Sequence, residues 1–202
     1  TCDIIEDTVN ELFDLKIKPL TIGGEHSLTV GVLNSLTEKY DDLTVVHLDA
    51  HRDLADTFIG EEYSHASVMK RVHEMGIKEL IQIGIRSASK EEEDFVENHS
   101  NIMTFKSNEV FSHLDNIEYY LSAVNTPIYL SIDMDVFDPS VAPTVGNPTP
   151  GGILYDHVEA ILKTLSLKNV VGMDVVETAG DRLGDITAVL ASKIIYDFLS
   201  LL

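Results

Sequence analysis

Two apolar runs of this 202-residue chain are each followed by side chains that can bind metal ions. These side chains stand at every second position: Asp49, His51 and Asp53 after the first run, Asp133 and Asp135 after the second. Because alternate residues of an extended backbone lie on one face, the members of each set can converge on one point. Carboxylates and imidazoles grouped in this way are common ligands of divalent cations.

A third segment, Gly-Gly-Glu-His-Ser at 23–27, places His26 at the start of a predicted helix. Taken alone, each of these short motifs is common and is more often a surface, capping or turn feature than a binding site. Taken together they indicate a function, because three separate strand ends each supply carboxylate or imidazole groups. Burying so many acids without cations would cost too much free energy.

Counting charges indicates how many ions these residues hold. Two divalent cations balance the four carboxylates of Asp49, Asp53, Asp133 and Asp135, whereas one ion would leave the site anionic. The oxygen and imidazole ligands include no thiolate, which disfavours a structural zinc site and favours manganese. Two such ions about 3.5–4 Å apart can share a water molecule and lower its pKa toward neutrality. The predicted cofactor is therefore two Mn²⁺ per chain.

These side chains must be positioned by the strands and helices around them. Short apolar runs alternate with helical patterns, which predicts an α/β fold with a mainly parallel sheet and helices on both of its faces. Sites in such sheets form at the carboxyl ends of the strands, where the metal-competent residues stand. The predicted strands are 19–22, 43–48, 79–85, 102–105, 127–132 and 170–176. The predicted helices are a first one with its apolar face at Ile5, Val9, Leu12 and Phe13, then 27–40, 65–76, 89–98, 108–124, 155–167 and 184–201, with a Pro/Gly-rich loop at 138–152.

Length and composition restrict the class of protein. The hydrophobic content of 44% is enough for one domain over residues 1–202. With 34 acidic and 14 basic residues the net charge is −20, which argues against a nucleic-acid partner and favours cations, either metals or cationic substrates. There is one cysteine, Cys2, no visible signal peptide, and no apolar stretch approaching the roughly 18 residues of a membrane helix. We therefore expect no membrane association and a cytoplasmic location.

Longer motifs add a resemblance to a known family. The segments that carry it are GGEHS (23–27), DAHRD (49–53), SIDMDVFDP (131–139), NPTPGG (147–152) and VVGMDVVET (170–178). In kind and order they are similar to the signatures of the ureohydrolase family, which includes arginase, agmatinase, guanidinobutyrase and formimidoylglutamase. The resemblance implies a three-layer α/β/α fold, a dinuclear manganese centre, hydrolysis at a guanidino-type carbon, and a homo-oligomer, trimer or hexamer.

The resemblance also implies roles for single residues. Two overlapping sets of ligands would each hold one manganese ion, and two aspartates would bridge the ions. The sets are His26, Asp49, Asp53 and Asp133 for one ion, and Asp49, His51, Asp133 and Asp135 for the other. His65 resembles the histidine that moves protons in this family, and Glu177 resembles the carboxylate that anchors the guanidinium. A carboxylate suits that role because it pairs with a planar guanidinium through two hydrogen bonds.

Three features depart from the family pattern. Glu25 stands where aspartate is commoner, and Arg52 stands inside the metal motif where a small residue is usual. Arg52 alternates away from the ligands, so we expect it to point to another layer or to form a salt bridge. Family members usually carry a further strand and helix before the GGEHS motif, and we expect this chain to lack that region together with part of the active-site rim.

The leading hypothesis is an agmatinase-like enzyme that converts agmatine and water into putrescine and urea. Family members that act on arginine have an asparagine two residues after the DAHxD motif, where this chain has Ala55, and the acidic Asp56, Glu61 and Glu62 follow. Both features disfavour a substrate carboxylate. The alternatives are arginase or guanidinobutyrase activity, and an inactive metal-binding homologue or regulatory subunit. A zinc amide hydrolase of the deacetylase fold fits less well, because the ligands suffice for two ions.

Overall fold

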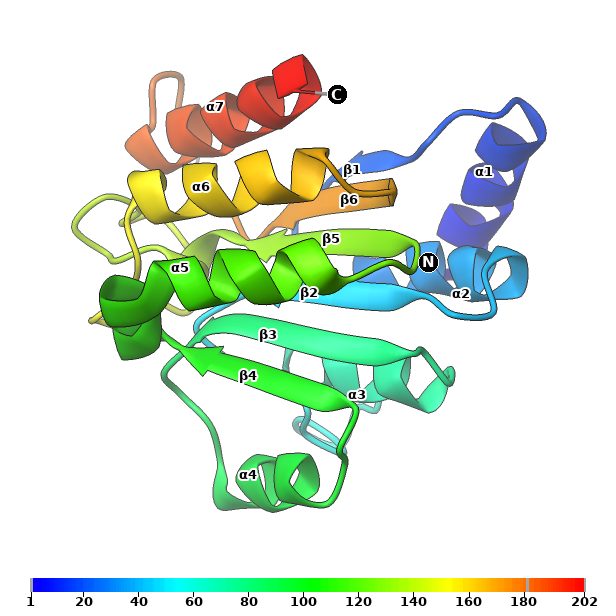
Figure 1. Cartoon of the computed structure of the whole chain (residues 1–202), viewed down its shortest axis with the longest axis horizontal. Coiled ribbons are helices and arrows are strands. Elements are labelled where there is room, and N and C mark those ends of the chain that lie inside the picture. The colour runs from blue at the N-terminus through cyan, green and yellow to red at the C-terminus, as the bar shows by residue number, and fades with distance from the viewer. Residues whose placement is uncertain (1, 181, 202) are drawn as a thin grey trace.

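A six-stranded sheet forms the centre of the molecule, as described by a computed structural model for residues 2–180 and 182–201 (Figure 1). The strand order is β1-β6-β5-β2-β3-β4, and every pair of neighbours is parallel. The strands are β1 (Leu20–Ile22), β2 (Thr44–Leu48), β3 (Glu79–Ile85), β4 (Ile102–Lys106), β5 (Ile128–Asp133) and β6 (Val170–Val176). The helices are α1 (Cys2–Asp14), α2 (Leu28–Lys39), α3 (Val68–Glu74), α4 (Lys90–Glu97), α5 (Ser107–Ala123), α6 (Tyr155–Ser166) and α7 (Ile186–Leu201), with 3₁₀ turns η1 (His65–Ser67) and η2 (Met134–Val136).

Helices cover both faces of this sheet. The central strands β2, β5 and β6 are buried at every residue, which explains why their sequences are continuous apolar runs rather than alternating ones. One buried cluster joins the sheet to α5, α6 and α7, and a second joins it to α1, α2 and α3. These layers are visible in Figure 1, and the predicted three-layer α/β fold is confirmed.

The chain changes direction across the sheet between β2 and β5. From β2 it proceeds through β3 to the edge strand β4, and then returns to place β5 on the other side of β2. In open parallel sheets such a switch point, at the carboxyl ends of the strands, is where ligands bind. Asp49 directly follows β2 and Asp133 closes β5, so the fold places both aspartates at this point.

Some elements differ from those that the sequence predicts. The helix predicted at 65–76 begins as the 3₁₀ turn η1, in which the side chains of Ser64 and Ser67 form a capping box, and only then becomes α3. Helix α5 contains a kink at His113, whose φ of −143° is not helical. His26, predicted at a helix start, lies in the turn just before α2. None of these differences moves a predicted site residue away from the carboxyl edge of the sheet.

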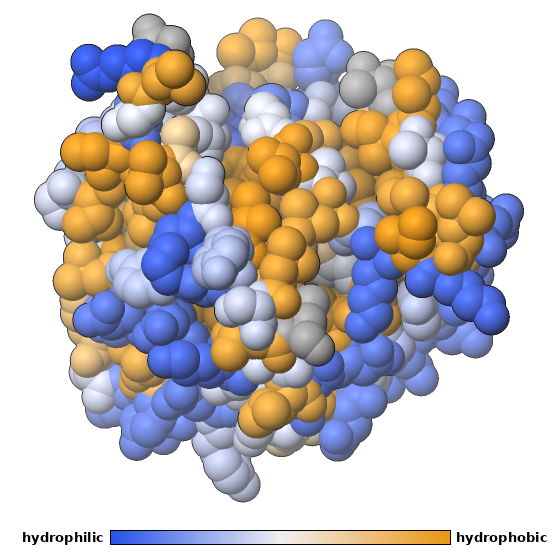
Figure 2. Space-filling model, turned by 90° about the horizontal axis from the view of Figure 1, so that it is seen from above, coloured by the Kyte–Doolittle hydropathy of each residue, from blue (hydrophilic) through white to orange (hydrophobic). Residues whose placement is uncertain are grey.

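The surface above α7 carries much apolar area, and groups of apolar side chains are visible from that side in Figure 2. On α7 itself Ile186, Val189 and Leu199 are each at least 53% exposed, and Ile22 of the edge strand β1 is 70% exposed. Large exposed apolar patches often mark surfaces that another polypeptide covers. Among the described residues, no helix is both long enough and apolar enough to cross a membrane.

Candidate metal centre and substrate cavity

The aspartates that follow β2 and β5 lie side by side. Leu48 pairs with Ile132 in the parallel ladder, so the next residues, Asp49 and Asp133, occupy adjacent positions at the strand ends. Two residues further along each chain segment, His51 Nδ1 lies 2.9 Å from Asp135 Oδ2. The structure therefore brings together the two sets of side chains whose common spacing first indicated a metal site.

The spacing of two residues also fixes the orientation of the carboxylates. Asp49 Oδ1 accepts the backbone N–H of His51 at 2.5 Å, and Asp133 Oδ1 accepts the N–H of Asp135 at 2.8 Å. Asp135 Oδ1 in turn accepts the N–H of Ala50 at 3.1 Å. One oxygen of each of these three carboxylates is thus held by the backbone, which fixes the direction in which the other oxygen points.

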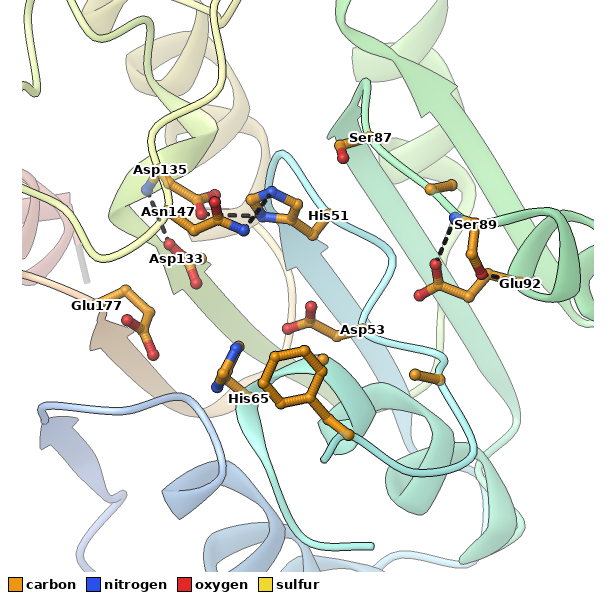
Figure 3. A pocket seen from close by; sticks show the side chains of 14 residues that line it. His51, Asp53, His65, Ser87, Ser89, Glu92, Asp133, Asp135, Asn147 and Glu177 are labelled. Atoms are coloured by element: carbon orange, nitrogen blue, oxygen red, sulfur yellow. Dashed lines mark hydrogen bonds and ion pairs between the residues drawn. The ribbon is translucent and has the colours of Figure 1, made fainter. Parts of the chain in front are cut away.

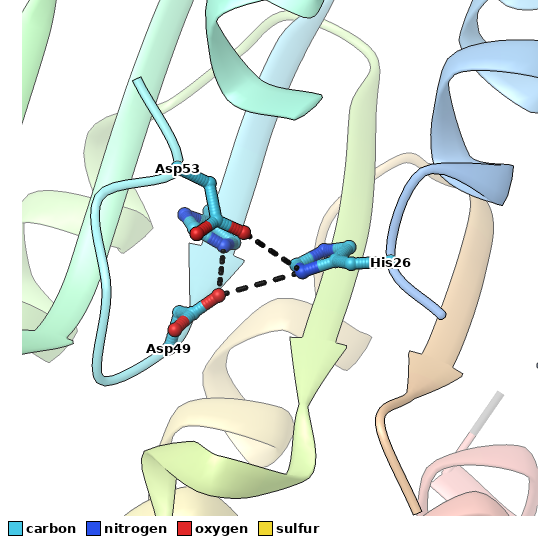
Figure 4. A group of neighbouring side chains, drawn as sticks. His26, Asp49 and Asp53 are labelled. Carbon is cyan, nitrogen blue, oxygen red and sulfur yellow. Dashed lines mark hydrogen bonds and ion pairs between the residues drawn. The ribbon is translucent and has the colours of Figure 1, made fainter. Parts of the chain in front are cut away.

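The imidazole of His26 points one nitrogen, Nδ1, at three carboxylate oxygens of this cluster. Its Nδ1 lies 3.2 Å from Asp53 Oδ2, 3.2 Å from Asp133 Oδ2 and 3.5 Å from Asp49 Oδ2. Figure 4 shows His26, Asp49 and Asp53 pointing toward one another from separate segments. Although Nδ1 is fully buried, it has no hydrogen-bond partner of acceptable geometry. Four ligand atoms therefore surround one point without bonding to each other, as the ligands of a cation do.

The hydrogen bond of His26 Nε2 shows which charge is required beside Nδ1, the nitrogen on the other side of the ring. Ser131 Oγ donates to Asp174 Oδ1 at 2.8 Å, so it can only accept from His26 Nε2 at 2.9 Å. With its hydrogen on Nε2, a neutral His26 directs the Nδ1 lone pair at three carboxylates, which is repulsive unless a cation stands between them. Although burial lowers the pKa of His26, the nearby carboxylates of Asp133, Asp49 and Asp53 outweigh this effect and raise that pKa. The cluster requires a positive charge at this point, and a divalent metal ion fits the donor set.

The carboxylates repel one another strongly when no cation is present. Burial and the charge of Asp49 raise the pKa of Asp53 to about 8 and that of Asp135 to about 6, and they raise the pKa of Asp133 as well. The four aspartates therefore cannot all be ionised at neutral pH without compensating charge. Two divalent cations supply that compensation, as the charge count predicts.

The possible ligands form two groups that share Asp49. The first consists of His26, His47, Asp49 and Asp53, and the second of Asp49, His51 and Asp135. Asp133 joins the first group through its contact with His26. All six predicted metal ligands thus lie within or against these two groups, although a bridging position for Asp133 stays a prediction.

His47 is a functional candidate that the sequence reasoning missed. Its Nε2 lies 2.7 Å from Asp49 Oδ2 and its Nδ1 lies 3.2 Å from Gln82 Nε2, so both ring nitrogens already have partners. We therefore place His47 behind Asp49 rather than among the metal ligands. Burial lowers the pKa of His47, against the opposing effect of Asp49. The available signal was a histidine at an inward position of an otherwise apolar strand, two residues before Asp49.

A cavity of about 290 Å³ opens onto the candidate metal centre. Its lining includes the ligands His51, Asp53, Asp133 and Asp135. His65 and Glu177 also line it, from different elements, and Figure 3 shows both side chains beside these ligands. The structure thus places the two predicted catalytic residues and the candidate metal centre around one space.

The backbone of Glu177 is strained, and contacts with neighbouring segments hold it in place. It directly follows β6 and has a φ of +62°, a left-handed conformation that is rare for a residue with a long side chain. Its N–H donates to Gly24 O at 2.8 Å, and its Oε1 accepts the N–H of His26 at 2.8 Å. Asp53 also has a left-handed φ, of +55°. Strain of this kind collects at functional sites, where the surrounding structure enforces it.

His65 lies at the rim of the cavity, where it has two neighbours. Its Nδ1 is 3.5 Å from Glu25 Oε1, and both side chains are nearly half exposed. Its ring meets the edge of Phe58 with the ring centroids 4.9 Å apart. Glu25, one of the departures from the family pattern, therefore supports His65 and does not belong to the two groups of metal ligands.

Helix α4 holds the loop that follows β2, which carries the predicted ligands His51 and Asp53. Arg52 Nη2 donates to Glu93 at 2.8 Å, which confirms the predicted salt bridge of this arginine. The adjacent Glu92 accepts the N–H of Leu54 at 3.0 Å. The side chain of Glu92 also lines the cavity, so the beginning of α4 forms part of its wall.

Comparison with known proteins decides which family shares these features. The profile of the arginase family matches residues 1–200. The chain belongs to the arginase family. It is 38% identical over 200 residues to N(1)-aminopropylagmatine ureohydrolase from Thermococcus kodakarensis and 36% identical over 193 residues to agmatinase from Pyrococcus horikoshii.

These alignments cover 97% and 94% of the chain, but 66% and 65% of the two relatives. The agmatine ureohydrolase of Thermoplasma volcanium, whose crystal structure is known, is 32% identical with a TM-score of 0.89. That match covers 99% of this chain and 67% of the other. This arginase-family hydrolase thus spans about two thirds of the length of the relatives that it resembles.

Proposed function

We propose that this protein uses two manganese ions to hydrolyse the guanidino group of a small linear amine, converting agmatine into putrescine and urea. One observation carries the proposal: the candidate metal centre and Glu177 face the same cavity. When bound, the ions would supply a water molecule of lowered pKa as the nucleophile. The six residues that the family resemblance implies as ligands would hold these ions: His26, Asp49, His51, Asp53, Asp133 and Asp135.

Glu177 would orient the substrate. Its carboxylate can pair with a guanidinium, which carries its hydrogen-bond donors in one plane. The N–H of His26 holds Oε1, and the left-handed backbone at Glu177 fixes the direction of the side chain. Because the same His26 contributes its ring to the candidate metal centre, the guanidinium anchor and the ions keep a fixed relation. Such positioning lowers the entropic part of the reaction barrier.

His65 would exchange a proton with the departing amine. It lies at the exposed rim of the cavity, where it can reach both a bound substrate and solvent. Glu25 beside its Nδ1 would orient the ring. General acid–base assistance of this kind typically contributes ~100- to 10,000-fold to a rate.

The other end of the substrate would meet Ala55, a residue that offers no donor to a carboxylate, in a wall to which Ser87, Ser89 and Asn147 also contribute. Ala55 lines the cavity, which supports reading this position as one that affects specificity. Glu92 is the acidic residue beside it, whereas Asp56, Glu61 and Glu62, predicted near the rim, are not among the lining residues. The α-carboxylate of arginine would face the like charge of Glu92 in this wall, and we expect that repulsion to give at least a tenfold preference for agmatine.

Urea release tests this function directly. We expect kcat/KM for agmatine, with manganese present and any native flanking sequence included, to exceed that for arginine at least tenfold. The matched variant Ala55→Asn should raise the relative rate with arginine, because the amide supplies a donor to the carboxylate. A preference of the unmodified protein for arginine would overturn the proposal in favour of arginase.

N(1)-aminopropylagmatine is a second candidate substrate. The relative from Thermococcus kodakarensis bears that name, and the compound has the same guanidinobutyl end as agmatine. Including it, together with guanidinobutyrate, in the urea assay separates the remaining substrates. Full occupancy by manganese without urea from any of these compounds would instead support the inactive metal-binding alternative. A homo-oligomer and a cytoplasmic location stay predictions, the former open to sedimentation analysis.

A further inference from the structure

We propose that Arg52, Gln82 and His47 form a hydrogen-bonded chain that positions Asp49 for the two cations. The inference rests on the proposed metal centre. It assigns a role to the arginine that departs from the family pattern and to a buried histidine outside the ligand set. All three side chains are buried, with exposures of 2%, 0% and 0%.

The arginine fixes the orientation of the Gln82 amide. Arg52 Nη1 lies 2.9 Å from Gln82 Oε1, and a guanidinium can only donate, so the atom that faces it must be the amide oxygen. The amide nitrogen then faces the backbone oxygen of Arg52 at 2.8 Å, which it satisfies as a donor. Turning the amide over would oppose donor to donor and oxygen to oxygen. Only one orientation of Gln82 is therefore compatible with Arg52.

The orientation of Gln82 fixes the tautomer of His47. The second hydrogen of the amide nitrogen points to His47 Nδ1 at 3.2 Å, so Nδ1 must be the acceptor nitrogen of the ring. The hydrogen of the neutral imidazole is consequently on Nε2. It donates to Asp49 Oδ2, which is 2.7 Å away. The opposite tautomer would oppose donor to donor between Nδ1 and Gln82, and lone pair to lone pair between Nε2 and Asp49.

Asp49 thereby receives a second fixed hydrogen bond. The N–H of His51 holds Oδ1, and His47 holds Oδ2, so the carboxylate plane cannot turn. Asp49 is also the residue that the two groups of possible ligands share. Groups behind the ligands of a metal ion typically change its affinity ~10- to 100-fold when they are removed. We expect an effect of that size on both ions.

The end of the hydrogen-bonded chain that lies farthest from Asp49 is anchored to strand β4 and helix α4. The guanidinium of Arg52 also donates to Thr104 Oγ1 of β4 at 2.9 Å and to Glu93 of α4 at 2.8 Å. These contacts hold Arg52 independently of Gln82. They also allow a control, because Thr104→Val removes a partner of the guanidinium without changing the bond that orients Gln82.

The tautomer can be measured without catalysis. Two-bond ¹H–¹⁵N NMR correlations of the metal-free protein, at a pH where His47 is neutral, should show Nε2 as its only protonated nitrogen. Gln82→Glu keeps an acceptor for Arg52 but turns an oxygen toward Nδ1, so it should give a ring that is protonated at Nδ1, whereas Thr104→Val should keep the single Nε2 tautomer. A wild-type His47 protonated at Nδ1, or a Gln82→Glu variant that keeps the Nε2 tautomer alone, overturns the proposal.

Metal affinity supplies a second readout with a matched pair of variants. The amide nitrogen of His47→Gln can reach the position of Nε2 and donate to Asp49, whereas that of His47→Asn reaches only the position of Nδ1. Manganese titration should show ~10- to 100-fold weaker binding for His47→Asn and recovery of most of this loss in His47→Gln. Equal affinities of the two variants would contradict the positioning role. Neither readout depends on urea release, so a chain that passes both but hydrolyses no guanidino compound refutes only the proposed function.

Discussion

At the residue scale, the spacing of the aspartates has two effects. It places successive ligands on one side of the backbone, and it lets each leading carboxylate accept the N–H of the residue two positions later, as Asp49 and Asp133 do. The backbone itself thus orients one oxygen of each leading carboxylate. The Nδ1 lone pair of His26, which points at three carboxylates, marks where a cation is required.

Single substitutions can distinguish a metal ligand from a residue that only transfers protons. Asp133→Asn removes one negative charge and turns an amide toward His26, so we expect loss of manganese and no measurable urea release. His65→Asn keeps the metal centre and should lower kcat ~100- to 10,000-fold. Manganese content and urea release are measured for both variants, with the exposed Asp115→Asn on α5 as control. Similar residual rates for the two site variants would show that these roles are wrongly assigned.

At the element scale, the site depends on how closely β3 approaches the turn after β5. Gly84 in β3 has a φ of +98°, and a Cβ at this position would lie 2.6 Å from Val136 Cγ2 and 3.1 Å from the backbone oxygen of Asp49. Val136 belongs to the same turn as Asp135. A side chain at residue 84 must therefore displace parts of both metal-bearing segments.

The substitution Gly84→Ala tests this packing. We expect it to lower the free energy of unfolding by more than the roughly 1–3 kcal/mol of backbone strain alone, and to weaken manganese binding. Gly76→Ala is the matched control, since Gly76 also has a left-handed φ, of +83°, but open space around its Cβ. Denaturant unfolding and manganese titration compare the two. Equal losses of stability with unchanged manganese affinity in both variants would refute the steric argument.

The sequence predicts elements well where a pattern is local. The apolar runs at 79–85 and 170–176 match β3 and β6 residue for residue, because a strand buried on both faces needs no partner to be recognised. The six predicted metal ligands lie together in the structure because three strand ends deliver them to one edge of a parallel sheet. The spacing within each motif can be interpreted from the sequence, because it depends only on the backbone geometry of a few consecutive residues.

Features that depend on partners from distant segments could not be predicted. The role of His47 requires Gln82 from the neighbouring strand, and the left-handed backbone of Glu177 is imposed by contacts with Gly24 and His26. The kink at His113 likewise has no signature in the helical pattern around it. Such features arise from packing between elements, and the sequence alone does not show which elements meet.

At the scale of the whole molecule, the negative net charge and the candidate metal centre both favour the binding of cations. The net charge of −20 produces a field that attracts cations, and the deepest concentration of acids lies at the carboxyl edge of the sheet. A surface of this charge also favours a cationic substrate such as agmatine. Fold, family and charge are therefore consistent with the proposed hydrolysis of a positively charged guanidino compound.

The central claim is that the chain holds two divalent cations. It is tested most directly by dialysing the protein against manganese, removing free metal, and measuring the metal content per chain. We predict a value approaching two equivalents, falling in Asp133→Asn, because four aspartates and two histidines converge around two groups of ligand positions that share Asp49. A clean stoichiometry of one, with no weaker second site in a manganese titration, would contradict the dinuclear account.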